Sequence, residues 1–99
     1  LLAEANVVMQ AQAAGSVEEA RARLAADPKS IEAQYNLAMA LAAGGEYAEA
    51  LELLLGTVRR DRRWRDDAAR LAMLGLFDLL GDENPLTRAY RNKLSQALF

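Results

Sequence analysis

Two stretches of this chain, thirty residues apart, carry the same residues at the same places. Residues 15–24 read GSVEEARARL and residues 45–54 read GEYAEALELL, so a glycine, a glutamate, an alanine and a leucine coincide. A weaker third copy begins at Gly81, with Tyr90 in the place of the leucine. Self-similarity with a period of thirty-odd residues is typical of helical repeat proteins, in which each unit packs on its neighbours.

The composition favours helix throughout. The 99 residues include 21 Ala and 17 Leu but only four Val and one Ile, so few residues prefer a pleated sheet. Turn residues divide the chain, and helical periodicity between them predicts six helices. We expect them at residues 1–14, 16–26, 30–43, 46–59, 63–80 and 84–98. Because the connections are short, neighbouring helices must run antiparallel.

The middle of the chain, residues 31–64, resembles the tetratricopeptide repeat. The residues that carry this resemblance are Leu37, Ala38, Leu41, Gly45, Tyr47 and Ala50. Gln34, Thr57 and Arg62 depart from the pattern. We therefore predict one all-α domain over residues 1–99, a tetratricopeptide-like α-solenoid of about three antiparallel helix pairs. The expected units are residues 1–30, 31–64 and 65–99, and the second helix of the first unit should be short.

The expected core of this solenoid consists of large apolar side chains at helical spacing, with small alanines where helices cross closely. The alanines are Ala20, Ala38 and Ala50. The large core residues are Leu24, Leu37, Leu41, Leu51, Leu54, Leu74, Phe77, Leu86, Tyr90 and Leu94.

The sequence contains few residues that could carry out catalysis. There is no His and no Cys, so a zinc site, a thiol nucleophile and a histidine base are excluded. The adjacent carboxylate pairs, such as Glu18-Glu19 and Asp66-Asp67, suit helix N-termini and do not converge on one atom. We predict no enzyme, no cofactor and no metal site. The apolar stretch 71–80 is about half the length of a membrane span, and we expect no membrane partner.

The most basic segment reads RRDRRWR, from Arg59 to Arg65. A basic run with an aromatic residue can bind single-stranded nucleic acid or an acidic protein. Arginine near a helix C-terminus also offsets the helix dipole, while Trp64 could close the seam between the second and third units. Because the chain carries a net charge of −2, we favour the structural reading and expect no nucleic-acid partner.

Tetratricopeptide domains usually bind along a concave face lined by the first helix of each unit. Alignment of the three units places there Leu2, Ala5, Met9, Gln12, Glu32, Tyr35, Met39, Ala42, Leu71, Gly75 and Asp78. This set is apolar and lacks the basic residues that would capture an acidic C-terminal tail. We expect it to hold an extended or helical apolar peptide, or else to be covered by a neighbouring domain. The predicted contact residues are Met9, Tyr35, Met39 and Leu71.

From residue 48 onward the chain resembles a narrower group. The stretches ALELLLGTVRRD (50–61), FDLLG (77–81) and YRNKL (90–94), with Trp64, Pro85-Leu86 and Leu98-Phe99, are similar to the C-terminus of bacterial thioredoxin-like co-chaperones. These are the YbbN-type proteins, or chaperedoxins. Since residue 1 is Leu and no signal segment opens the chain, we expect a fragment of a longer protein.

The resemblance implies a cytoplasmic bacterial holdase with a thioredoxin-fold domain before residue 1. Its repeats would contact unfolded client proteins and the chaperonin, with the last helix as a docking element. The implied docking residues are Arg88, Arg91, Lys93, Leu98 and Phe99. The alternative is that the repeats form a structural scaffold that dimerises or braces the neighbouring domain, in which case a homo-oligomer is expected.

Overall fold

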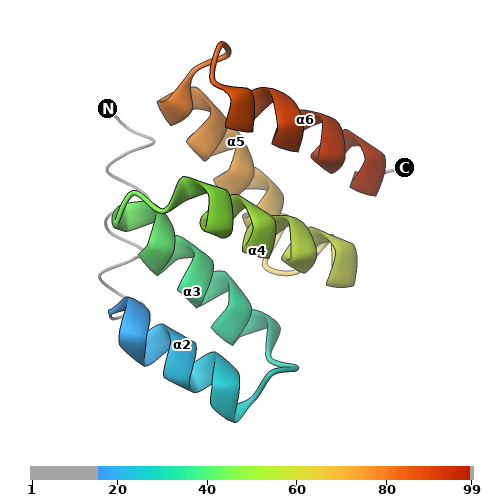
Figure 1. Ribbon diagram of the computed structural model, residues 1–99. Helices are drawn as coiled ribbons and strands as arrows, with labels where there is room; N and C mark the ends of the chain where they lie inside the picture. Colours follow the sequence, from blue (N-terminus) through green and yellow to red (C-terminus); the bar gives the residue numbers. More distant parts are fainter. Residues whose placement is uncertain (1–15, 99) are drawn as a thin grey trace.

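A computed structural model describes residues 16–98 of the chain, and these residues form helices without a strand (Figure 1). The all-α prediction is confirmed. The helix expected at residues 1–14 lies outside the described residues. The five helices are α2 (Val17–Ala26), α3 (Ile31–Ala43), α4 (Tyr47–Arg60), α5 (Ala68–Leu80) and α6 (Pro85–Leu98).

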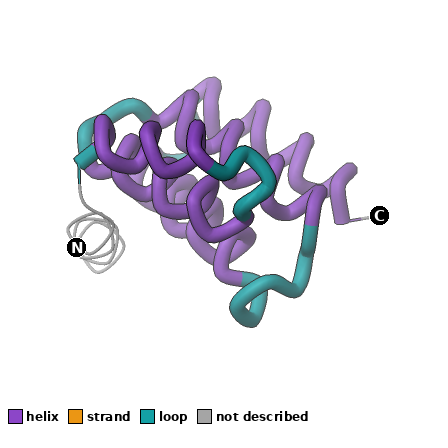
Figure 2. Tube along the Cα trace, turned by 90° about the horizontal axis from the view of Figure 1, so that it is seen from below, coloured by secondary structure: helices purple, strands orange, loops and turns teal. Residues whose placement is uncertain are grey.

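Each helix packs against the next in the sequence, and α4 also packs against α6. Short loops join successive helices (Figure 2), and these helices pack against one another. The chain therefore runs back and forth as in a helical solenoid. As expected for the first repeat, α2 is short, with 10 residues against 14 in α4.

Local sequence accounts for most helix starts. Ser16 accepts a hydrogen bond from the backbone N–H of Glu19 at 3.1 Å, and Ser30 accepts one from Ala33 at 3.0 Å. Asn84 accepts from the backbone of Leu86 at 2.8 Å. Each side chain satisfies an N–H group that the helix itself leaves unpaired.

The second and third helix pairs are related by a constant shift of 36 residues. Four buried residues of α3, shifted by 36, fall on the four buried residues of α5. Three buried residues of α4 fall in the same way on the three buried residues of α6. The same shift carries Gly45 onto Gly81, which have φ values of 85° and 92°. The equivalent buried residues are Ala33 and Ala69, Leu37 and Met73, Ala40 and Leu76, Leu41 and Phe77, Leu51 and Thr87, Leu54 and Tyr90, and Val58 and Leu94.

Most of the predicted core is confirmed, including the close-packed alanines Ala20, Ala38 and Ala50. The confirmed large residues are Leu37, Leu41, Leu51, Leu54, Phe77, Tyr90 and Leu94. Leu24 and Leu86 are only half-buried at its margin. The prediction for Leu74 is wrong, because this side chain is 38% exposed. Leu74 lies 36 residues after Ala38, and no described neighbour encloses it as Ala38 is enclosed.

The helix predicted from residue 63 begins at Ala68 instead. Arg65, Asp66 and Asp67 have φ values of 48°, 55° and 65°, in the left-handed region, so they cannot belong to a right-handed helix. Asp66 and Asp67 therefore precede α5 rather than forming its first turn. The neighbouring Trp64 and Arg65 side chains contact Tyr35 and Glu32 of α3.

Candidate functional site

Of the residues expected to line an open groove, Tyr35, Met39 and Ala42 lie in the core. Tyr35 is 5% exposed and Met39 is 1% exposed. The ring of Trp64 lies against Tyr35, with centroids 5.0 Å apart and planes inclined at 56°. The groove expected at these positions is therefore closed in this structure, and a contact of Tyr35 or Met39 with a partner stays a prediction. Met9 lies outside the described residues.

The outer face of α5 is different. Leu71 is 53% exposed and Leu74 is 38% exposed, and they are the exposed large apolar side chains among residues 16–98. Gly75 is half-buried and Asp78 is exposed on the same face. By the 36-residue shift these four positions correspond to Tyr35, Ala38, Met39 and Ala42, all of which are buried. The same face is therefore covered in α3 and open in α5.

The arginine-rich segment binds other parts of the protein. Arg60 donates to the side-chain oxygen of Gln34 at 2.8 Å and to the carbonyl oxygen of Lys29. Arg62 donates to the carbonyl oxygen of Leu98 at 3.4 Å, near the C-terminus of α6. The guanidinium of Arg65 lies 3.4 Å from the carboxylate of Glu32. Three of the five arginines thus connect the end of α4 to α3 and α6, as the structural reading predicts.

Trp64 joins the second and third helix pairs. It is half-buried against the core, its ring packs at a tilt against Tyr35 of α3, and the Arg65 guanidinium lies 4.7 Å from its ring centroid. The position of Trp64 between α4 and α5 agrees with its expected place at the seam between the second and third repeat units.

The basic residues expected on α6 are largely paired within the chain. Arg88 lies 2.7 Å from the Glu83 carboxylate, and Arg91 lies 3.0 Å from that of Asp82. Lys93 instead lies over the ring of Tyr90, with its nitrogen 4.6 Å from the centroid. An acidic partner at Arg88 or Arg91 would therefore compete with the 81–84 turn.

The apolar tip expected at the end of α6 is described in part. Leu98 is half-buried against the core, and Phe99 lies outside the described residues.

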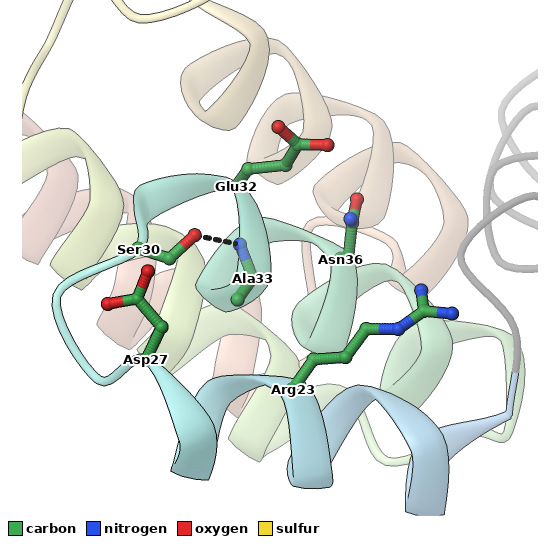
Figure 3. Close-up of a pocket in the computed structure, with 6 residues that line it drawn as sticks. All are labelled: Arg23, Asp27, Ser30, Glu32, Ala33 and Asn36. Atoms are coloured by element: carbon green, nitrogen blue, oxygen red, sulfur yellow. Dashed lines mark hydrogen bonds between the residues drawn. The ribbon is translucent and has the colours of Figure 1, made fainter.

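Two surface hollows are polar. One of ≈ 220 Å³ lies where α2 leads into α3 (Figure 3), and within it Ser30 is already engaged in capping α3. Its lining residues are Arg23, Asp27, Ser30, Glu32, Ala33 and Asn36. The other, of ≈ 460 Å³, is lined by Arg62, Arg63, Asp66 and Asp67. No cluster of three potential metal ligands occurs in the part of the chain that is described.

Sequence reasoning missed two features. Leu74 is apolar and lies at core spacing along its helix, which predicts burial. Its actual exposure depends on what packs against the outside of α5, and spacing does not show this. Gln34 was noted only as a departure from the repeat pattern. In the structure its amide donates to the carbonyl oxygen of Leu53 at 2.9 Å and accepts from Arg60, so it fastens α3 to α4.

Antiparallel helices in sequence order, a repeated burial pattern and an open apolar helix face define a helical-repeat protein of the α-solenoid class. A profile of the tetratricopeptide repeat matches residues 10–99, and the chain belongs to that family. Tetratricopeptide repeats generally mediate protein–protein interaction. No curated protein and no solved structure matches the chain. Among the described helices, none combines the length and apolar character that crossing a membrane requires.

Proposed function

We propose that this domain binds partner proteins through the outer face of α5. The observation that carries the proposal is the exposure of Leu71 and Leu74 at positions whose equivalents in α3 are buried. Two large apolar side chains on adjacent turns of one helix offer an apolar stripe to a partner. Gly75 beside them leaves room for a protruding side chain of the partner.

The partners that the sequence resemblance supports are unfolded client proteins, with the domain serving a thioredoxin-like co-chaperone of the YbbN type in a bacterial cytoplasm. An apolar stripe suits such clients because they expose apolar segments that folded proteins bury. Short, flat apolar contacts also tolerate different sequences, as a holdase requires.

Suppression of the thermal aggregation of citrate synthase, followed by light scattering, tests the client role. The 99-residue chain should reduce scattering, and Leu71→Asp/Leu74→Asp should need about tenfold more protein for the same effect, since about 1.4 kcal/mol of lost apolar contact is a factor of ten. Ala48→Asp/Ala89→Asp adds the same two charges at exposed positions of α4 and α6 and should act like the unmodified chain. Equal suppression by both variants would remove the α5 face from the proposal.

If the chain has no effect on citrate synthase and instead sediments as a dimer, the scaffold alternative holds. In that outcome Leu71→Asp/Leu74→Asp locates the dimer contact, because the variant should sediment as a monomer if α5 forms the interface.

The second proposed contact is with a chaperonin through the exposed side of α6. Lys93 is the best probe of it, because Arg88 and Arg91 are engaged by Glu83 and Asp82. Replacing the two arginines with glutamate would set like charges against the 81–84 turn and would disturb the fold itself. Lys93→Glu avoids this problem.

Binding of labelled chain to purified bacterial chaperonin, measured by fluorescence anisotropy, tests this contact. Lys93→Glu should weaken binding several-fold at low salt and less at high salt, where surface charges are screened. Lys29→Glu makes the same charge reversal in the connection between α2 and α3 and should bind normally. Identical affinities for the two variants would exclude Lys93 as a docking residue.

A further inference from the structure

The connection between α4 and α5 is unusual in length and in backbone conformation. It spans seven residues, 61–67, whereas the other connections span residues 27–30, 44–46 and 81–84. Three of its residues in succession, Arg65, Asp66 and Asp67, are left-handed without being glycine. An L-residue in that region brings its Cβ close to the backbone, and although a single aspartate tolerates this, three such residues in succession are energetically costly.

The local sequence favours a different state. Residues 64–67 contain no Gly or Pro, and Asp66 and Asp67 would be favourably placed in the first turn of a helix. If that turn joined α5, the connection would shrink to residues 61–63, the same length as residues 44–46. The chain already forms a turn just before this segment. The backbone N–H of Arg63 donates to the Asp61 carboxylate, and that of Trp64 donates to the Asp61 carbonyl oxygen, each at 3.2 Å.

Two side-chain contacts to α3 hold the left-handed turn against this preference, and the Arg70 guanidinium of α5 lies 3.6 Å from the Asp67 carboxylate. Trp64 packs on Tyr35 at 5.0 Å between centroids, and Arg65 lies 3.4 Å from Glu32 while covering the Trp64 ring. Both anchors belong to α3. Glu32 is exposed, so a partner molecule can reach it.

We propose that residues 64–67 form a two-state junction. In the state described here the turn is left-handed and Trp64 covers Tyr35. In the other state residues 64–67 extend α5 by one helical turn, Trp64 leaves Tyr35, and the Tyr35 side of α3 opens. A partner that occupies Glu32 or Tyr35 favours the second state, because it replaces the contacts that hold the first. This inference goes beyond the proposed α5 contact and does not depend on it.

Two double variants of the full 99-residue chain test the junction. Asp66→Gly/Asp67→Gly and Asp66→Ala/Asp67→Ala remove the same two carboxylates, but glycine favours the left-handed turn and alanine favours the helix. Trp64 is the only tryptophan, so its fluorescence reports this site. Backbone ¹³Cα shifts of residues 64–67 report the conformation directly.

The glycine variant should keep left-handed shifts and the emission maximum of the unmodified chain. The alanine variant should show helical shifts at residues 64–67, a red-shifted emission and several-fold stronger quenching by acrylamide. Left-handed shifts and unchanged emission in both variants would overturn the proposal.

A second variant covers the case in which the alanine pair prevents folding, which loss of the far-ultraviolet helix signal would reveal. Glu32→Gln removes the partner of Arg65 without altering the junction, and it should move Trp64 emission and the ¹³Cα shifts in the same direction. No movement of either signal in folded Glu32→Gln would then count against two states.

Discussion

Gln34 shows how a single residue can depart from the repeat pattern and still serve the fold. Its amide crosses α4 to reach the carbonyl oxygen of Leu53, passing over Gly56. A Cβ built at Gly56 would lie 2.7 Å from the Gln34 side-chain nitrogen. A glycine inside a helix is unfavourable by about 1 kcal/mol relative to alanine. The close approach of the Gln34 amide accounts for the presence of a glycine at position 56 of α4.

Gly56→Ala should therefore change the free energy of unfolding by less than about 0.5 kcal/mol, because the gain in helix propensity is offset by the loss of the Gln34 bond. In a Gln34→Ala background the same substitution should stabilise the protein by about 1 kcal/mol. Urea unfolding of the four proteins measures the coupling between the two residues. The same gain in both backgrounds would show that Gln34 does not restrict Gly56.

Thr87 is a polar residue that occupies a core position. It occupies the position in α6 that corresponds to Leu51 in α4, it is fully buried, and its hydroxyl has no hydrogen-bond partner within residues 16–98. A buried hydroxyl without a partner costs about 1–3 kcal/mol. Thr57 is also buried, but its hydroxyl donates to the Leu53 carbonyl oxygen at 2.9 Å.

Thr87→Val should raise the free energy of unfolding by about 1 kcal/mol, since it removes an unpartnered polar group and keeps the volume. Thr57→Val is the matched control, and it should be neutral or destabilising because it removes a formed hydrogen bond. Thermal unfolding by circular dichroism measures both. A lower melting temperature for Thr87→Val than for Thr57→Val would contradict this account.

At the scale of the helix, the sequence predicted those features that depend on a few neighbouring residues. The helices expected from residues 16, 30 and 84 begin one residue later, directly after the capping side chains of Ser16, Ser30 and Asn84. The start of α5 was misplaced by five residues, because contacts from Trp64 and Arg65 to α3 override the local preference for helix. The exposure of Leu74 on the α5 face was missed for a related reason, since periodicity marks a side chain as apolar without showing what covers it.

One ion pair between helices is sensitive to pH. Arg21 of α2 makes a two-bond contact with the carboxylate of Glu49 on α4, at 2.9 and 2.8 Å. Hydrogen bonding by Arg21 holds the pKa of the Glu49 carboxyl below its ordinary value. Because the folded-state pKa is lowered, the stabilisation is present above the unfolded-state pKa of about 4.3 and is lost as the pH falls through the folded-state value.

Titration of the Glu49 side-chain carboxyl by ¹³C NMR should therefore give a pKa below that of an unpaired glutamate, and Arg21→Gln should raise it. Added salt should have the same direction of effect, since both groups are on the surface. An unchanged Glu49 pKa in Arg21→Gln would show that the pair does not form in solution.

At the scale of the whole molecule, α4 holds the described part together. It packs against α3, α5 and α6, and its buried face includes Leu51, Leu54 and Leu55. In contrast, α2 packs mainly against α3 and contributes Ala20 as its one buried residue. Helical repeats are stabilised by contacts between neighbouring elements, so cooperativity should decrease away from the best-packed helix.

Native-state hydrogen exchange should consequently separate the two helices. Amides of α4 should exchange only by global unfolding, with free energies that fall with urea, whereas those of α2 should exchange through a local opening that urea hardly affects. Arg21→Gln should speed exchange in α2 by weakening its tie to Glu49, and it should leave the α4 amides close to their original rates. Equal exchange free energies in α2 and α4 would mean that the domain unfolds as one unit.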